Sequence, residues 1–208
     1  PAQAGSGREG LPLSKPSSLA SSSSKSLGAL VSKEDLKAQA RAELQAWLLG
    51  DERLDFRSHR DPSSSDRQCA VSVIVVLFNQ AGLTKRCLDS ILAYAQGTDI
   101  HIDLEVLLVD NASSDDTQAL LGRLDGVRII RHEENLGFLK AVNKAAPLAA
   151  HELLLFLNND AELLPGSLEA AVKRLASDAR IQAVGGPVIL YDGSCLLYTS
   201  PSPRDVEE

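Results

Sequence analysis

Methionine and paired cysteines are missing from the sequence, and each absence limits what the chain can be. The 208 residues contain no methionine and begin at Pro1, so we expect an excerpt of a longer protein whose true N-terminus lies elsewhere. Cys69, Cys87 and Cys195 show no paired spacing, which argues against structural zinc and favours a reducing compartment. We therefore expect a cytoplasmic location, which includes the inner face of the membrane.

Long apolar runs and an excess of positive charge are also absent. No run approaches the roughly 20 apolar residues that a bilayer span requires, and the N-terminus lacks the apolar core of a secretory signal. The net charge of -7 gives a nucleic-acid partner little electrostatic support. The hydrophobic share of 44% and the charged share of 24% are globular in type. We expect no membrane span and no nucleic-acid partner.

Three segments precede the part of the chain that carries a regular α/β pattern. Residues 1–30 are rich in Ser, Gly and Pro and predict a flexible leader, because they offer too little apolar surface to offset the entropy of ordering. Residues 31–50 predict an amphipathic helix, with Ser32 and Asp35 as its capping box. Residues 51–70 are charged and polar and predict a linker.

Residues 71–194 alternate short apolar runs with segments of helical periodicity. The expected strands are Val71–Phe78, Leu104–Val109, Val127–Ile130, Leu153–Leu157 and Ile181–Val184. Apolar residues recur at helical spacing between them, over residues 83–92, 113–124, 138–145 and 168–175. Strands that alternate with helices imply right-handed crossovers, so we expect an α/β fold with a mostly parallel, Rossmann-like sheet flanked by helices.

Polar residues follow three of these strands, where sheets of this kind bind their ligands. Phe78 ends the first strand and can flank a base, while Asp110 follows the second and can accept hydrogen bonds from a ribose or a base N–H. Asn158–Asp160 follows the fourth strand, and the Asp160 carboxylate can ligate a hard divalent cation that also holds substrate phosphates.

Each of these signals has a purely structural alternative. An Asp or Asn after a strand is often a turn former or a helix cap. Taken alone, Asp110 fits a turn as well as it fits a ligand site, and Asn158–Asp160 fits a turn better. Asn135–Phe138 is likewise typical of a turn that opens a helix. The placement of the first two signals at one edge of the sheet favours the functional interpretation.

The order of these motifs resembles glycosyltransferase family 2, and within it the rhamnosyltransferase-like bacterial members that build surface polysaccharides. The resemblance covers about residues 71–193 in register and order. It is carried by Val71–Asn79, Leu107–Asp115, Asn135–Asn143, Phe156–Asp160 and Gly185–Gly193. It implies a GT-A fold, of which this chain holds the nucleotide-binding half.

The resemblance also assigns roles to residues. It implies nucleotide-binding positions at Phe78, Asp110, Asn111 and Asn159, and a ligand for Mg²⁺ or Mn²⁺ at Asp160. Asn159 and Asp160 match the last two positions of the family's D-x-D-type motif, which meet the ribose and the metal. Asn158 and Asn159 stand where many members have acidic residues, so a single carboxylate remains for the metal.

The implied activity is that of an inverting glycosyltransferase with a UDP- or dTDP-sugar donor. The acceptor would be a glycan or a lipid-linked sugar in cell-surface polysaccharide synthesis. In the family the base is an acidic residue downstream of the metal motif. The one downstream candidate, Asp192, is typical of a turn with Gly193. We therefore expect the base to be absent and this chain alone to be inactive.

The C-terminal residues suggest why the base is missing. Cys195–Asp205 resembles the in-frame translation of a transposase-type sequencing-library adapter, so we expect residues 195–208 to be non-native and residues 71–194 to be a truncated domain. A genuine Pro/Ser-rich tail is the alternative.

Two other functions compete with glycosyl transfer. One is a non-catalytic nucleotide- or carbohydrate-binding module. The other is a nucleotidyltransferase, which should carry a Gly-rich, basic loop after the first strand, whereas Asn79–Leu83 holds one glycine.

Overall fold

The computed structural model describes residues 32–57, 69–97, 102–190 and 195–196. All of them belong to the second of two compact units, Pro1–Leu30 and Val31–Glu208. The predictions for the leader, for linker residues 58–68, for the Asp192 turn and for tail residues 197–208 lie outside the described residues.

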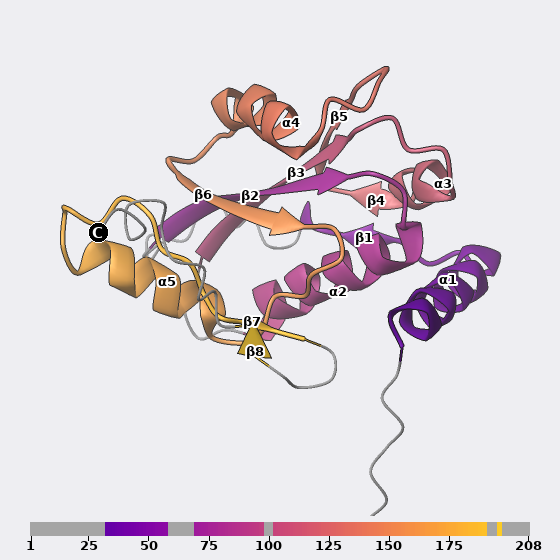
Figure 1. The fold of residues 1–208 in the computed structure, drawn as a ribbon, viewed down its shortest axis with the longest axis horizontal. Coiled ribbons are helices and arrows are strands. Elements are labelled where there is room, and N and C mark those ends of the chain that lie inside the picture. The colour runs from indigo at the N-terminus through magenta and orange to yellow at the C-terminus, as the bar shows by residue number, and fades with distance from the viewer. Residues whose placement is uncertain (1–31, 58–68, 98–101, 191–194, 197–208) are drawn as a thin grey trace, which may run out of the picture. The chain divides into compact units, whose positions relative to one another are not determined.

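From β2 to α5, helices separate the long strands of the described chain, as the pattern of apolar runs predicted (Figure 1). The helices are α1 (Lys33–Leu49), α2 (Ala81–Gly97), α3 (Thr117–Leu121), α4 (Phe138–Ala145) and α5 (Ser167–Ala176), with a 3₁₀ turn at Ala146–Leu148. The strands are β1 (Leu54–Asp55), β2 (Cys69–Leu77), β3 (Ile102–Asp110), β4 (Leu124–Asp125), β5 (Arg128–Arg131), β6 (Leu153–Asn158), β7 (Val188–Ile189) and β8 (Cys195–Leu196).

Four strands form one fully parallel sheet in the order β5-β3-β2-β6. The chain starts in β2, moves outward to β3 and β5, and then returns to the other side of β2 as β6. Between β2 and β6 the strand order reverses, and in open α/β sheets such a switch point is where ligands bind. The predicted parallel, Rossmann-like α/β fold is confirmed.

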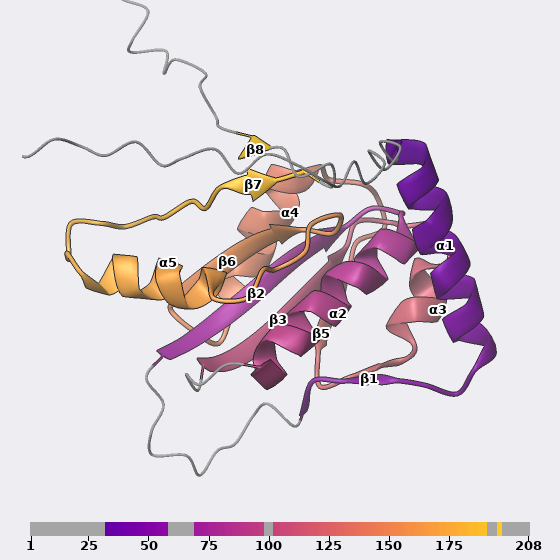
Figure 2. The same cartoon turned by 90° about the horizontal axis from the view of Figure 1, so that it is seen from below.

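Helices cover both faces of this sheet. Figures 1 and 2 show α4 on one face and α2 with α5 on the other. Alternate residues of β2 divide between the two sides: Val73 and Val75 join the cluster on the α2 side, and Ile74 joins the cluster with Ala141 and Val142 of α4. The continuous β-branched run of β2 therefore satisfies two cores at once.

A buried carboxylate ties the sheet together in the half of β2 that lies away from its carboxyl end, and its ion-pair partner Arg128 is partly exposed. Glu105 of β3 is 1% exposed. Its carboxylate accepts hydrogen bonds from Ser72 Oγ and the Ala150 backbone N–H, both at 2.6 Å, and from the Arg128 guanidinium at 2.8 Å. Burial raises the pKa of Glu105, but these hydrogen bonds and the Arg128 charge outweigh it, so the net pKa lies below its usual value.

The N-terminal helix α1 packs closely on α2. Ser32 and Asp35 form the predicted capping box, in which the Asp35 N–H donates to Ser32 Oγ at 3.1 Å and the Ser32 N–H donates to the Asp35 carboxylate. A side chain on Gly82 of α2 would lie 2.5 Å from the backbone of Ala40. Glycine is therefore the residue that lets the two helices approach this closely.

The segment after α1 differs from the polar linker that its composition predicted. Leu54 and Phe56 are buried, and β1 pairs in parallel with β4. The sequence hid this strand because two isolated apolar residues carry no periodic signal. The strand residues Leu54 and Asp55 pair with Leu124 and Asp125, about 70 positions away.

Two other predicted elements differ in the structure. The predicted strand Ile181–Val184 is wrong: this stretch has no regular structure, and the short β7 that follows pairs antiparallel with β8. This stretch, in which Gln182 interrupts the apolar residues, pairs with no strand among the described residues. The predicted helix over 113–124 is shorter as α3, because the chain turns at Gly122 and Leu124 enters β4.

The helices of the described residues are all too short or too polar to cross a lipid bilayer.

We predict that Glu105→Gln lowers the free energy of unfolding by about 1–3 kcal/mol, because it leaves buried donors poorly matched. The lowered pKa also fixes the sign of the pH effect. The stabilisation is complete above the usual glutamate pKa of about 4.3 and is lost as the pH falls through the lowered value. Urea unfolding at pH 7 and pH 3 measures both effects. The exposed Glu152→Gln variant is the matched control, and an equal loss of stability in it would contradict the role of Glu105.

Candidate functional site

The carboxyl ends of β2, β3 and β6 meet at one edge of the sheet. The parallel register places Leu77 opposite Asp110 and Val76 opposite Asn158. The polar segments that follow the three strands therefore emerge side by side, as the sequence pattern predicted.

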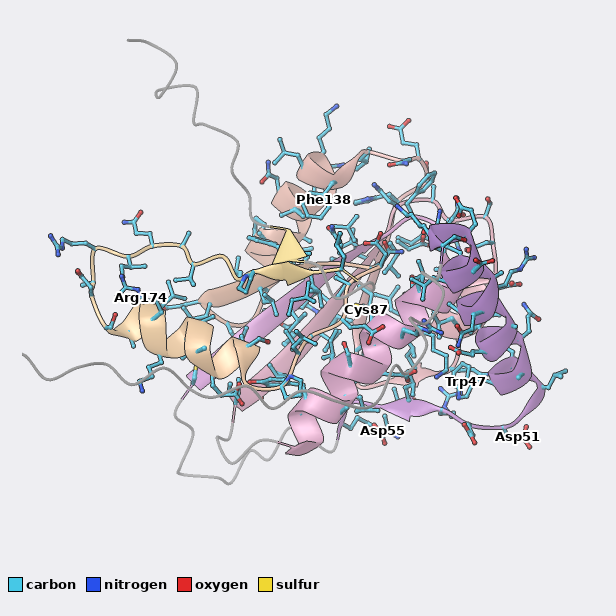
Figure 3. The ribbon with its side chains drawn as sticks, turned by 60° about the horizontal axis from the view of Figure 1, so that its bottom comes forward. Trp47, Asp51, Asp55, Cys87, Phe138 and Arg174 are labelled. Atoms are coloured by element: carbon cyan, nitrogen blue, oxygen red, sulfur yellow. The ribbon has the colours of Figure 1, made fainter. Side chains whose placement is uncertain are left out.

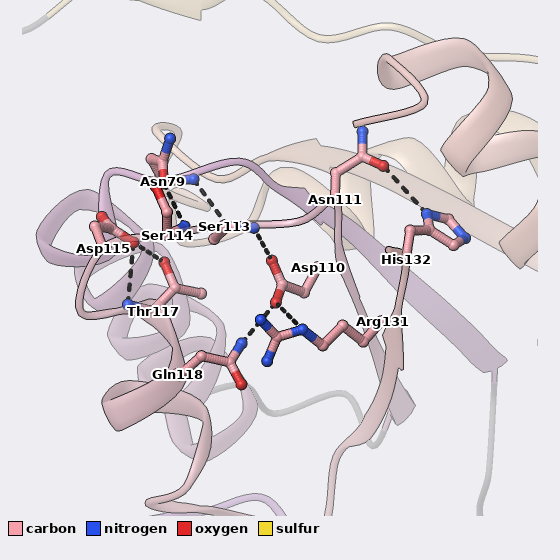
Figure 4. Close-up of polar contacts among 10 residues, drawn as sticks. All are labelled: Asn79, Asp110, Asn111, Ser113, Ser114, Asp115, Thr117, Gln118, Arg131 and His132. Atoms are coloured by element: carbon pink, nitrogen blue, oxygen red, sulfur yellow. Dashed lines mark hydrogen bonds and ion pairs between the residues drawn. The ribbon is translucent and has the colours of Figure 1, made fainter. Parts of the chain in front are cut away.

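Asp110 is fully buried at the end of β3 (Figure 4). Its Oδ1 accepts a hydrogen bond of 2.9 Å from the Ser113 N–H, and its Oδ2 accepts one of 2.6 Å from the Gln118 side-chain amide. The Arg131 Nε lies 3.6 Å from Oδ2 and supplies a balancing positive charge. Because Asp110 has no exposed surface, a ligand contacts this carboxylate only when a covering side chain moves.

Asn111 anchors the loop between β5 and α4. Its amide donates to Asn135 Oδ1 at 2.8 Å, while its own oxygen accepts from the Leu136 N–H at 3.2 Å and lies 3.1 Å from Nδ1 of His132. Asn135 also accepts from the Gly137 N–H at 2.8 Å. The turn interpretation of Asn135 therefore matches the structure, and Asn111 has a structural task beside its predicted nucleotide role.

The loops after β2 and β3 hold three non-glycine residues in left-handed backbone conformations. Asn79, Gln80 and Ala112 have φ angles of 57°, 60° and 64°, which cost energy and persist only where neighbouring contacts hold them. The contacts are reciprocal: the Asn79 N–H donates to Ser113 Oγ and the Ser114 N–H donates to Asn79 Oδ1, both at 2.9 Å. Ser113 thus bridges the two loops.

Asp115 links this loop pair to two helices. Its carboxylate accepts hydrogen bonds from the Ala81 N–H at the start of α2, at 2.9 Å, and from the Thr117 N–H at the start of α3, at 3.1 Å. Partial desolvation raises the pKa of Asp115, but the hydrogen bonds from Thr117 and Ala81 outweigh it and lower the net pKa. Asp116, the N-cap residue of α3, makes no side-chain hydrogen bond to the start of the helix.

The end of β6 brings Asn159 and Asp160 beside the end of β2. The Asn159 amide donates to the Asn79 carbonyl and to Thr84 Oγ1, both at 3.0 Å, so it locks β6 onto the start of α2. Asp160 is half-buried, and no hydrogen bond or ion pair to its carboxylate is formed by the part of the chain that the structure describes. Of the two, Asp160 is the side chain left to meet a ligand.

Phe78 lies directly after β2 and is 46% exposed. A phenyl ring this exposed at the end of a buried strand suits contact with a flat ligand such as a base. Phe78, Asp110, Asn159 and Asp160 therefore surround one edge, from three neighbouring strands.

Divalent metal binding is compatible with this edge when a phosphate ligand is present. The described residues contain no cluster of three or more His, Cys, Asp or Glu side chains arranged to hold a metal ion. Mg²⁺ is commonly bound through one or two carboxylates together with substrate phosphates. Asp160 supplies one such carboxylate, so the donor set fits a metal shared with a bound diphosphate and not a metal bound by the protein alone.

Cys87 of α2 lies in the interior behind this edge, whereas Phe138 and Arg174 point outward (Figure 3). Its thiol donates to the Asn158 carbonyl at 3.6 Å. Burial, together with the negative charges of Asp160 and Glu162, raises the pKa of the Cys87 thiol to about 12. The thiol is therefore an inert packing group beneath the end of β6.

Comparisons with known proteins place most of the described chain in one family. The sequence profile of "Glycosyl transferase family 2" matches residues 72–201. Human polypeptide N-acetylgalactosaminyltransferase 6 is 29% identical over 138 residues, which are 64% of this chain and 22% of that protein. The O-antigen biosynthesis protein RfbC of Myxococcus xanthus is 34% identical over 128 residues, or 60% of this chain and 10% of that protein.

Among solved structures, the mannosyltransferase PcManGT of Pyrobaculum calidifontis, in complex with GDP-Man and Mn²⁺, is similar at 28% identity and a TM-score of 0.46. The match covers 69% of this chain and 42% of that chain. The chain thus spans less than half the length of each of these three proteins.

We predict that Cys87 resists alkylation by iodoacetamide in the folded protein at pH 8. The thiolate is the reactive form, and a pKa of about 12 keeps Cys87 protonated. Cys69, which is only half-buried, should be modified faster. Peptide mass spectrometry after timed labelling measures both sites, with labelling in urea as the reference. Equal rates for Cys87 in folded and unfolded protein would show that the end of β6 is not packed as described.

Proposed function

Because the chain belongs to glycosyl transferase family 2, we propose that it provides the donor-binding part of an inverting glycosyltransferase. The observation that carries the proposal is the convergence of Phe78, Asp110, Asn159 and Asp160 at the switch point of the sheet. The Phe78 ring offers a flat apolar surface to a base, and the Asp110 carboxylate can accept a hydrogen bond from the N–H of that base. The separate Asp160 carboxylate can bind the metal ion of a metal-bound diphosphate.

The donor in this proposal is a UDP- or dTDP-sugar. Phe78 flanks the base, Asp110 accepts its N–H, and Asn111 and Asn159 shape the ribose side of the site. The acceptor is a glycan or a lipid-linked sugar of a cell-surface polysaccharide, which the likeness to an O-antigen biosynthesis protein supports. The protein then works in the cytoplasm, including the inner face of the membrane.

Asp160 is the residue that would hold Mg²⁺ or Mn²⁺ together with the donor diphosphate. A bound divalent ion would neutralise the charge that develops on the departing nucleoside diphosphate. The contribution of the chain itself is to fix this carboxylate. The Asn159 hydrogen bonds to Asn79 and Thr84 attach the segment that carries Asp160 to the end of β2 and the start of α2.

Transfer also needs a base that deprotonates the acceptor hydroxyl, which typically contributes about 10²–10⁴-fold to the rate. The proposal assigns that role to none of the described residues. That this chain alone does not transfer sugar stays a prediction.

Nucleotide binding tests the proposal directly. We expect UDP or dTDP to bind the chain in calorimetry, and Mn²⁺ or Mg²⁺ to strengthen the binding. Asp160→Ala should remove most of the metal effect and raise the Kd in the presence of metal by roughly 10-fold, which corresponds to about 1.4 kcal/mol.

The matched control is Glu152→Ala, which removes the same charge at the opposite end of β6 from an exposed position. It should leave the Kd unchanged. If metal leaves the affinity unaltered in both the unmodified chain and Asp160→Ala, Asp160 has no metal role. If neither nucleotide binds with or without metal, the proposed function is wrong.

A further inference from the structure

Gln118 is hydrogen-bonded to the carboxylate of Asp110, which in the proposed function accepts a hydrogen bond from the nucleobase. Its amide donates the 2.6 Å hydrogen bond to Oδ2 of the fully buried Asp110. The amide group is an N–H beside a C=O, the same pair that uracil and thymine present on their imide edge. Gln118 therefore gives Asp110 the same kind of N–H donor that the expected base would give it.

Gln118 is the covering side chain that a base can replace. Arg131, the other neighbour of Oδ2, carries the positive charge that balances the buried carboxylate, and a neutral base does not substitute for that charge. Gln118 is neutral and exposed, on a helix whose buried residues are Thr117, Leu120 and Leu121. Its side chain can therefore leave Asp110 while α3 stays packed.

The backbone of α3 is held in place from the N-terminal segment. Gln45 of α1 donates to the Asp116 carboxylate at 2.7 Å, directly before α3. Arg53 donates to the Gly122 carbonyl at 3.2 Å, directly after α3, and to the Asp125 carboxylate at 2.6 Å. The donors of all three contacts lie outside residues 72–201, the part that matches the family profile. They fix the distance from α3 to Asp110 and so keep the Gln118 amide within bonding reach.

We propose that Gln118 is an internal competitor for the nucleobase: its amide occupies Asp110 in the free protein and gives way to the imide N–H of a uracil or thymine nucleotide. This inference rests on the proposed function. The hydrogen bond keeps a buried carboxylate satisfied while no ligand is present. It also lowers the apparent affinity, because only molecules in which Gln118 has moved away can bind the base.

Gln118→Met tests the competition, because methionine keeps the side-chain length and the helix propensity but lacks the donor. The Kd for UDP should fall by about 3- to 30-fold. The gain should disappear with 3-methyluridine 5′-diphosphate, whose base has no imide N–H to donate. A purely structural effect would change both affinities together. Gln39→Met, which alters an exposed glutamine on α1 that bonds to Glu43, should change neither.

The side-chain amide of Gln118 gives a second readout by NMR, identified by its loss in Gln118→Met. Without ligand its protons should exchange slowly with water, and saturating UDP should return them to the position of a free glutamine. A free-glutamine signal in the absence of UDP overturns the inference, and so does a Kd for UDP that is unchanged or raised in Gln118→Met. If UDP and dTDP bind neither protein while the amide is protected, the proposed function itself has failed.

Discussion

The parallel pairing of β2 with both β3 and β6 is the constraint on which the rest of the structure depends. The pairing fixes the register of three strands. As a result Asp110 lies opposite Leu77, and Asn158 lies opposite Val76. A shift of one residue in either pair would exchange the residues that pack in the two cores and move the polar strand ends out of line. Every contact at the carboxyl edge, including the Asn159 bridge, relies on that alignment.

Much of the sheet could be predicted from the sequence, because strands buried on both faces leave continuous apolar runs. The edge could be predicted as well, since Phe78, Asp110 and Asp160 follow those runs directly. Gln118 and Asp115 were not found, because polar residues on a short helix or loop carry no periodic signal. β1 was missed for a related reason: its two residues pair with Leu124 and Asp125, about 70 positions away.

The amide side chains at the edge show where sequence patterns reach their limit. Asn111 and Asn159 occupy positions that the family resemblance links to nucleotides, yet in the structure both hold neighbouring loops together. In the sequence, an asparagine that holds a loop and an asparagine that contacts a ligand look the same, because both directly follow a strand. Geometry separates them from Asp160, whose carboxylate has no hydrogen bond or ion pair among the described residues.

The end of α1 depends on a residue far along the chain. The last turn of α1 has no basic side chain of its own, and its carbonyls at Trp47, Leu48 and Gly50 accept hydrogen bonds from the Arg123 guanidinium. Arg123 is synthesised well after α1. Until then, the carbonyl groups at the C-terminal end of α1 lack the hydrogen bonds that Arg123 donates to them. Ordering of this helix is thus coupled to completion of the domain behind it, and an isolated N-terminal segment should remain largely unfolded.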